Sequence, residues 1–328
     1  MTPEFRVVAD DVDVTAAIKA RLVSLSLTDK QGLEADELTI VIEDGNGRVA
    51  FPRRGVSLAV ALGWKGEALV EKGTFTVDQV GHDGPPDVIS ITARSADFQG
   101  SFKDQREAAY DSTTLGAILE TIAARNGLKP ALHADLAGIA IAHIDQTNES
   151  DANFVTRLGK DYGAVATIKA GRLLFVPSGR GIAASGRALP AIAIRRKDGD
   201  RHSFTATDRE GTTTGVKAKW HDLATGAARE VLAGEEGTTK TLKRLYPTRA
   251  EAQTAADAAF KKRKQSGHEF RVTLARGNPA IIASAPVVFL GWRPEIAAID
   301  WITGDITHTL AADGGFTTEI TANEADVE

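Results

Sequence analysis

The chain has 328 residues, of which 42% are hydrophobic and 25% are charged, and its formal net charge is −5. This composition predicts a globular protein of two or three domains, and the absence of cysteine excludes disulfides, thiolate zinc sites and a cysteine nucleophile. No stretch approaches the ~18 apolar residues of a membrane span, and the acidic balance argues against a nucleic-acid binder held by phosphate contacts.

The first hundred residues carry the pattern of antiparallel β-structure. Met1–Asp13 holds acidic residues and no apolar core stretch, so we do not interpret it as a signal peptide. Short runs of alternating apolar and polar residues follow, separated by polar or glycine-containing turns. The predicted strands are Leu22–Thr28, Glu37–Asp44, Val56–Trp64, Thr74–Val80 and Val88–Ala93. Several short strands at this spacing indicate an antiparallel barrel or sandwich.

From about residue 105 the pattern changes to a mixture of helix and strand. Leu115–Ala123 has apolar residues at helical spacing, with Ser112 or Thr113 as the predicted cap. A second helix is predicted from Ser150 to Gly163. Two short strands, Val165–Ile168 and Leu173–Val176, are then expected to pair across an Ala170-Gly171 turn. Residues 105–185 are therefore predicted to form an α+β domain.

The β pattern returns near Leu189 and continues to the end of the chain. Ile192, Ile194, Phe204 and Ala206 flank a predicted turn at Asp198-Gly199. One helix interrupts the pattern near 248–266, where Thr248–Glu251 forms a capping box. The remaining predicted strands are Phe270–Leu274, Val287–Gly291, Ile296–Ile302, Ile306–Leu310 and Phe316–Ile320.

The two β regions can be aligned with each other as a weak repeat. The alignment pairs Leu25–Asp44 with Ile192–Asp208, Val56–Trp64 with Pro286–Trp292, and Leu69–Asp97 with Glu295–Ala322. Any two antiparallel barrels share some of this patterning, so both a true repeat and a chance likeness stay open. If the repeat is real, a trimer would present six similar barrels in a ring, and a three-fold object could then meet a six-fold one.

Several segments, in this order and spacing, resemble the phage late-control D protein family. This family includes the hubs of contractile-tail baseplates and is related to the N-terminal part of type VI secretion spike proteins. The segments that carry the resemblance are 12–18, 21–29, 73–78, 84–86, 146–154, 157–158, 162–164, 277–279, 283–285, 306–308 and 314–318. The stretch Gln146–Phe154 is the most specific of them.

The resemblance implies a mainly β fold, with two tube-like antiparallel β-barrels and an intervening α+β domain. The expected boundaries are 1–104 for the first barrel, 105–185 for the middle domain, and 186–328 for the second barrel with its helical insertion. The implied function is a structural baseplate hub, a homotrimeric adaptor that joins a six-fold tail tube to a trimeric three-fold spike and contacts other baseplate proteins. We expect no cofactor, no metal, no membrane and no specific nucleic-acid partner, and a location in a virion or tail particle assembled in the bacterial cytoplasm.

Candidate catalytic and binding residues were weighed against plainer roles. Glu149 and Asp151 could form a glycosidase pair, but acids at a helix start favour a structural role. His133, Asp135 and His143 could bind a metal, although a surface loop is the favoured interpretation. The basic run at 261–264 is interpreted as a solvated helix end. The alternative function is therefore a tail-associated peptidoglycan hydrolase, and a DNA-binding regulator is a third hypothesis.

Two further expectations follow for the assembled hub. The net negative charge predicts a channel with more acids than bases, which anionic cargo would pass without binding. Arg53 and Arg54, in the loop Gly45–Arg54, are the candidate contact with the neighbouring tube ring.

Overall fold

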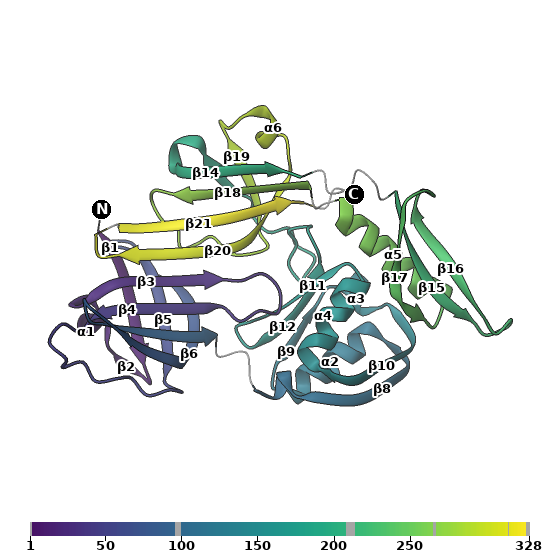
Figure 1. The fold of residues 1–328 in the computed structure, drawn as a ribbon, viewed down its shortest axis with the longest axis horizontal. Coiled ribbons are helices and arrows are strands. Elements are labelled where there is room, and N and C mark those ends of the chain that lie inside the picture. Colours follow the sequence, from purple (N-terminus) through teal and green to yellow (C-terminus); the bar gives the residue numbers. More distant parts are fainter. Residues whose placement is uncertain (1, 96–99, 208–213, 265–266, 314, 326–328) are drawn as a thin grey trace.

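A computed structural model of the chain describes residues 2–95, 100–207, 214–264, 267–313 and 315–325. Within these residues, none of the helices combines the length and the apolar character that crossing a membrane requires. The chain forms two β-rich modules, a middle α+β domain and a smaller insertion (Figure 1).

The first module contains seven strands and one short helix. Its elements are β1 (Pro3–Ala9), β2 (Val12–Asp13), α1 (Thr15–Lys19), β3 (Leu22–Asp29), β4 (Glu37–Glu43), β5 (Ser57–Trp64), β6 (Val70–Asp83) and β7 (Val88–Ser95). The long strand β6 pairs with β5 through its first half and with β7 mainly through its second half. Apolar residues at alternate positions of these strands form one buried core, as the period of two predicts.

The middle domain packs helices against two small sheets. Its elements are η1 (Gly100–Lys103), β8 (Gln105–Thr114), α2 (Leu115–Arg125), β9 (Lys129–Leu132), α3 (Ala134–Ala137), β10 (Ala140–Ser150), α4 (Asp151–Asp161), β11 (Ala164–Lys169) and β12 (Arg172–Pro177). β8 pairs with β10, and β12 lies between β11 and β9. The apolar stripes of α2 and α4 meet in a second core.

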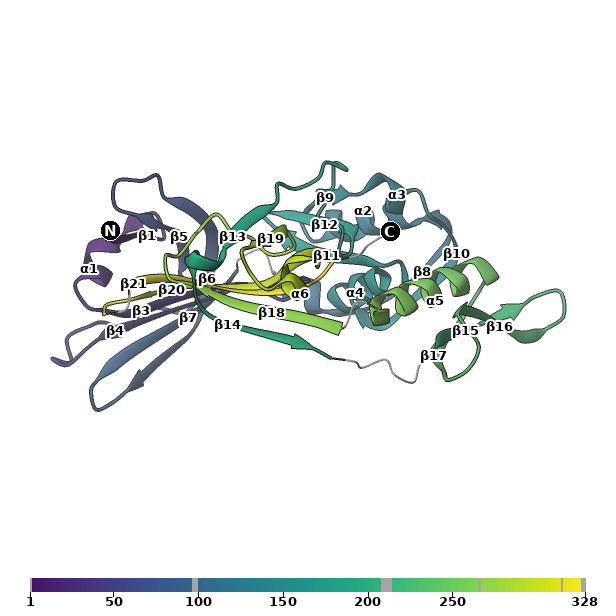
Figure 2. The same ribbon diagram turned by 90° about the horizontal axis from the view of Figure 1, so that it is seen from above.

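The second module is interrupted by an insertion with its own core. The module contains β13 (Ile192–Arg195), η2 (Arg196–Asp198), β14 (Gly199–Ala206), β18 (His268–Leu274), β19 (Pro286–Leu290), α6 (Pro294–Ala297), β20 (Trp301–Ala311) and β21 (Gly315–Glu324). Between β14 and β18 the chain forms β15 (Gly215–Asp222), β16 (Ala227–Gly234), β17 (Thr239–Tyr246) and α5 (Arg249–Lys264). The three inserted strands form a sheet of their own that packs on α5, and Figure 2 shows this unit at one end of the molecule.

One continuous sheet runs through both modules. Its strand order is β14-β18-β21-β20-β3-β4-β7-β6-β5-β1-β2, so β20 of the second module pairs with β3 of the first (Figure 1). This antiparallel pairing runs from Ile306 opposite Asp29 to Ala311 opposite Ser24, and we call it the internal seam. The expected mainly β chain with an α+β domain between two β regions is confirmed, but those regions share one sheet.

Two local predictions were wrong. Ile296–Ile302 is not a strand, because Pro294 starts α6 and the strand β20 begins only at Trp301. Helix α2 is capped by Thr114, whose hydroxyl accepts from Ala117 N at 3.2 Å, rather than by Ser112 or Thr113. The predicted turn near Asp198-Gly199 is present as η2, and the strands on its two sides pair elsewhere, β13 with β19 and β14 with β18.

Candidate interaction surfaces

The predicted interface residues Arg53 and Arg54 lie in the connection between β4 and β5, and both side chains are exposed. Asp44 holds the start of this loop, because its carboxylate accepts from Val49 N at 3.0 Å and its carbonyl accepts from Gly47 N at 2.8 Å. Gly55 N donates to Val77 O at 2.7 Å, which fixes the other end to β6. The arginines therefore stand on an anchored loop, and their role as an interface stays a prediction.

The same loop carries an exposed aromatic residue that the sequence analysis missed. Phe51 is 61% exposed, and its ring meets His82 of β6 edge-on at 6.1 Å. Beside it lies a shallow hollow of about 330 Å³ lined by Pro52, Arg54 and residues 78–80 of β6. Exposed aromatic and arginine side chains are enriched where proteins bind one another. The signal in the sequence was the Phe-Pro-Arg-Arg run, in which only the arginines were chosen.

The most specific sequence segment, Gln146–Phe154, builds a buried polar network. Asp151 has no solvent exposure and accepts from Gln146 Nε2 at 2.9 Å and from Asn126 Nδ2 at 2.8 Å. The Arg125 guanidinium lies 3.0 Å from the same carboxylate. Ser150 caps α4 by accepting from Asn153 N, as predicted. Asp151 therefore holds the middle domain together, because a buried charge is stable only when it is paired and hydrogen-bonded.

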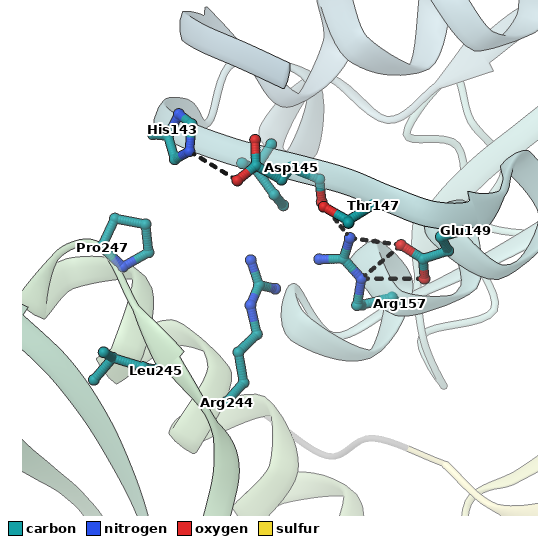
Figure 3. A pocket seen from close by; sticks show the side chains of 9 residues that line it. His143, Asp145, Thr147, Glu149, Arg157, Arg244, Leu245 and Pro247 are labelled. Atoms are coloured by element: carbon teal, nitrogen blue, oxygen red, sulfur yellow. Dashed lines mark hydrogen bonds and ion pairs between the residues drawn. The ribbon is translucent and has the colours of Figure 1, made fainter. Parts of the chain in front are cut away.

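Glu149 faces a cleft of about 390 Å³ between β10 and the end of β17 (Figure 3). Its carboxylate accepts from Arg157 Nε at 3.1 Å and from Nη2 at 2.7 Å. Arg244 reaches towards the cleft from the insertion, and its Nη1 donates to Asp161 at 2.5 Å. Burial raises the pKa of Asp161, against the opposing effect of Arg244. Because Asp151 is buried elsewhere and Glu149 is held by arginine, the two do not form a catalytic carboxylate pair.

The histidines considered as metal ligands have carboxylate partners instead. His143 Nδ1 lies 2.5 Å from Asp111, and Nε2 lies 3.1 Å from Asp145. Hydrogen bonds to Asp111 and then Asp145 raise the pKa of His143. His133 lies 3.7 Å from Asp135. No group of three or more potential ligands able to hold a metal occurs in the part of the chain that the structure describes.

The internal seam is strengthened by contacts outside the strands. Trp64 Nε1 of the first module donates to Gly277 O of the second at 2.9 Å. The Trp64 ring also packs 5.5 Å from Phe316. Lys72 Nζ donates to Pro279 O at 2.9 Å. The two modules are therefore fixed together as one body.

A buried ionic cluster ties the middle domain to this seam. Lys169 of β11 donates to Asp29 at 2.6 Å and also to Asp36. Burial raises the pKa of Asp36, against the effect of Lys169. Burial favours a lower pKa for Lys169, but the two carboxylates outweigh it and the pKa is raised. Asp29 also accepts from Ala283 N of the second module at 3.3 Å, so one carboxylate contacts three parts of the molecule.

His308 is fully buried beside the seam, where Nδ1 lies 2.9 Å from Thr318 Oγ1. Burial, together with the nearby charge of Lys72, lowers the pKa of His308 to about 3. The ring is therefore neutral in the folded chain at ordinary pH, which suits a structural role in the core.

Comparison with known proteins identifies relatives over almost the whole chain. A family model described as "Phage tail baseplate hub (GPD)" matches residues 37–291. The chain is 40% identical to the "Probable baseplate hub protein" of Escherichia phage P2, in an alignment that covers 100% of this chain and 95% of the phage protein. It is 37% identical to the protein of the same name from Escherichia phage 186, with the same two coverages.

Solved structures share the fold at lower identity. A tail protein from Neisseria meningitidis is similar with a TM-score of 0.71 and 14% identity, covering 99% of this chain and 97% of that protein. A component of the type VI secretion system of Escherichia coli is similar with a TM-score of 0.56 and 12% identity, covering 93% and 73%. At these identities the likeness establishes the common fold.

Proposed function

Because this chain belongs to the phage tail baseplate hub family, we propose that it assembles as a homotrimer that joins the tail tube to the spike. The chain is a structural component of a phage tail baseplate and not an enzyme. The hydrolase hypothesis loses its support, because the carboxylates that suggested it have structural partners. The trimer and the named partners are the proposal.

The two β modules within one chain support the trimer. Three copies would place six modules in a ring, so that the same subunit could meet a six-fold tube on one side and a three-fold spike on the other. Unpaired strand edges invite pairing with another chain. Sedimentation or native mass measurement tests the trimer, and a monomer over a wide concentration range would exclude it.

The domain boundaries 1–104, 105–185 and 186–328 are part of this proposal. The separate buried clusters of the first module, the middle domain and the second module support the division. The insertion has a fourth cluster, in which β15 and β16 pack on α5. The insertion is thus larger than the helix expected near 248–266, because three strands accompany α5.

One face of the continuous sheet is a candidate wall for the channel. Side chains alternate along each strand, and the face opposite the cores carries hydroxyl groups in register across neighbouring strands. One such row consists of Thr92, Thr39, Ser26, Thr309 and Thr317. In β4, β7, β18 and β21 this parity places Glu37, Glu43, Glu269 and Glu319 on the same face as Arg94 and Arg271. The balance of four acids to two bases fits a channel with more acids than bases. DNA retention by the assembled protein at moderate salt would contradict this assignment.

We further propose that Arg53 and Arg54 contact the neighbouring tube ring. The double change Arg53→Glu with Arg54→Glu should abolish attachment to the tube, because it replaces two exposed positive charges with negative ones on an anchored loop. The trimer should persist. Arg172→Glu with Arg187→Glu reverses two positive charges at exposed positions outside this loop and is the matched control. Co-sedimentation with assembled tubes measures the effect, and undiminished attachment would reject the assignment.

Assembly within the bacterial cytoplasm completes the proposal. The relatives are phage baseplate proteins, so the chain belongs to a phage tail particle. The absence of cysteine fits assembly in a reducing compartment. Imaging the purified protein as a three-fold ring with a central pore is the most direct test of the whole proposal.

A further inference from the structure

The two modules contain the same four-stranded unit. In the first module the order is β6-β7-β4-β3, and in the second it is β20-β21-β18-β14. In each unit the first two strands form a hairpin, and the preceding strand, β5 or β19, pairs with the first strand of that hairpin. The counterpart of β4 is therefore β18, beyond the insertion, and not the segment ending at Asp208 that the sequence alignment chose.

The residue registers of the two units also coincide. A row of paired residues crosses each unit, and the two rows are Val80, Ile91, Ile40, Leu25 and Ile306, Ile320, Val272, His202. When residues are counted from these rows, the register shift of β3 between Leu22 and Ser24 falls at the same place as that of β14 between Gly199 and Arg201. The irregularity of β6 between 77 and 79 corresponds in the same way to that of β20 between 303 and 306. Coincident bulges fix the residue-by-residue equivalence, because a bulge pins the register of a strand.

The internal seam joins the last strand of one unit to the first strand of the other. β3 pairs with β20, and their core-facing residues Leu27 and Ile306 are 1% and 0% exposed. The outer ends of the two units are the second half of β6 and the strand β14, for which no further pairing is recorded among the described residues. His82 of β6 is exposed, and Phe204 of β14 is only half-buried.

We infer that β6 of one copy pairs with β14 of the next copy in the register of the internal seam. When each residue pair of the internal seam is replaced by its equivalent residues in β6 and β14, Val80 lies opposite Ala206 and Gly81 opposite Thr205. It also places His82 opposite Phe204 and Asp83 opposite Ser203. This inference rests on the proposed trimer and adds to it the strands, the direction and the residue pairs of the interface.

An unpartnered indole supports a contact between the same two modules of neighbouring copies. Trp64 and Trp292 each follow a glycine at the end of the corresponding strands β5 and β19. Trp64 Nε1 donates across the internal seam to Gly277, in the connection between β18 and β19. Trp292 is 8% exposed, and its buried Nε1 has no partner among the described residues. A buried donor without an acceptor is costly, so a missing partner is expected.

The same equivalence identifies that partner. The connection between β4 and β5, residues 44–56, corresponds to the connection that contains Gly277. In the assembled ring a backbone carbonyl of this loop, from the next copy, would accept from Trp292 Nε1. The loop would therefore serve the contact between copies through its backbone, and its exposed side chains would remain available to the tube.

Charge at the two edges is complementary. The β6 edge ends in Asp83 and leads to Asp87, whereas residues 195–201, at the start of β14 and just before it, hold four basic residues and two acidic ones, Asp198 and Asp200. The transferred register brings Arg201 to the 84–87 turn. Opposite charges across a strand pair stabilise it and oppose a shifted pairing.

Paired cysteines test the register, because the native chain contains none. In Asp83→Cys with Ser203→Cys, oxidation should join neighbouring copies into covalent dimers and closed trimers on a non-reducing gel, since opposed residues lie within disulfide reach. The matched control is Asp83→Cys with Thr205→Cys, which uses the same strands and face but is displaced by two residues. The equivalent seam pair, Ser26→Cys with Thr309→Cys, should give a disulfide within one chain.

The outcomes separate this inference from the proposed function. A cross-link in the first variant and little in the displaced control supports the register. A trimer by native mass in which the first pair stays reduced, or the displaced pair cross-links better, overturns the register and leaves the trimer standing. A monomer by native mass, with the seam pair still forming its internal disulfide, overturns both.

Discussion

The internal seam and the outer edges of the sheet use equivalent strand positions in opposite ways. At the seam, Ile306 and Leu27 are buried because the neighbouring module continues the sheet. At the outer edges, Val80 and Phe204 occupy the corresponding positions and remain partly exposed. One chain therefore contains a completed contact and the two separated halves of a similar contact. The internal seam shows which strand pairing and which hydrogen bonds would complete the two outer edges.

Single side chains repeat this contrast. His308 and His82 are equivalent in the two hairpins, yet His308 is fully buried and the side chain of His82 is 42% exposed. Trp64 has an acceptor across the seam, and the buried nitrogen of Trp292 has none among the described residues. Because the residue types are the same, the difference comes from the presence or absence of a neighbouring module and not from the residue itself.

A large expected effect concerns the loss of stability at acid pH that His308 causes at the seam. The folded pKa of His308 is about 3, below the 6.5 of an unfolded histidine, so the unfolded chain binds the proton more tightly. The contribution of neutral His308 to the unfolding free energy is fully present above pH 6.5 and is lost as the pH falls towards 3. Between pH 7 and pH 4 this one group should cost about 3 kcal/mol of unfolding free energy. Urea unfolding at the two pH values measures the loss.

His308→Gln separates this group from the other titrating residues. The amide cannot take up a proton in this range, so the variant should lose about 3 kcal/mol less than the parent between pH 7 and pH 4. Its stability at pH 7 can differ from the parent without affecting the argument, because the readout is the difference between two pH values. The same acid loss in both proteins would show that His308 does not titrate on unfolding.

A second contrast compares the aliphatic residues of the equivalent strands. Ile306→Ala removes a fully buried side chain from the seam and should lower the unfolding free energy of the single chain by about 2–5 kcal/mol. Val80→Ala removes a partly exposed side chain at the equivalent position and should cost the single chain less than about 1 kcal/mol. Val80→Ala should instead weaken the trimer, as concentration-dependent mass measurements would report. Equal losses of chain stability would remove the distinction between seam and edge.

Sequence patterning located most strands of the first module, because its core residues alternate cleanly with polar ones. Leu25, Leu27, Leu38 and Ile40 all lie at the predicted alternate positions and are buried. The helix cap at Ser150 was predictable for a similar reason, since the cap depends on residues a few positions apart. The family resemblance was confirmed by relatives that cover the whole chain.

Features that depend on distant parts of the chain were not predictable in this way. The strand β1, which pairs with β5, was not predicted, because only the acidic residues of Met1–Asp13 were considered. The counterpart of β4 was misplaced because residues 207–267, which include the insertion, separate β14 from β18. Neither the seam acceptor of Trp64 nor the exposure of Phe51 follows from local spacing, since each is decided by which segments meet in three dimensions.

The smallest expected effect, and the sharpest comparison, is between the two tryptophans. Trp64→Phe removes the donor to Gly277 and leaves a carbonyl unpaired at the seam, so the single chain should lose about 1–2 kcal/mol. Trp292→Phe removes a donor that has no partner within the described chain, so the single chain should lose less. If the next copy supplies the acceptor, Trp292→Phe should weaken each contact between copies by about 1 kcal/mol, roughly a five-fold change in affinity per contact. Urea unfolding of the dissociated chain and the concentration dependence of assembly measure the two effects separately. If Trp292→Phe lowers chain stability and leaves assembly unchanged, the indole has its acceptor within one chain. The contact between copies would then lack the counterpart of the Trp64–Gly277 hydrogen bond, and the internal seam would no longer describe it.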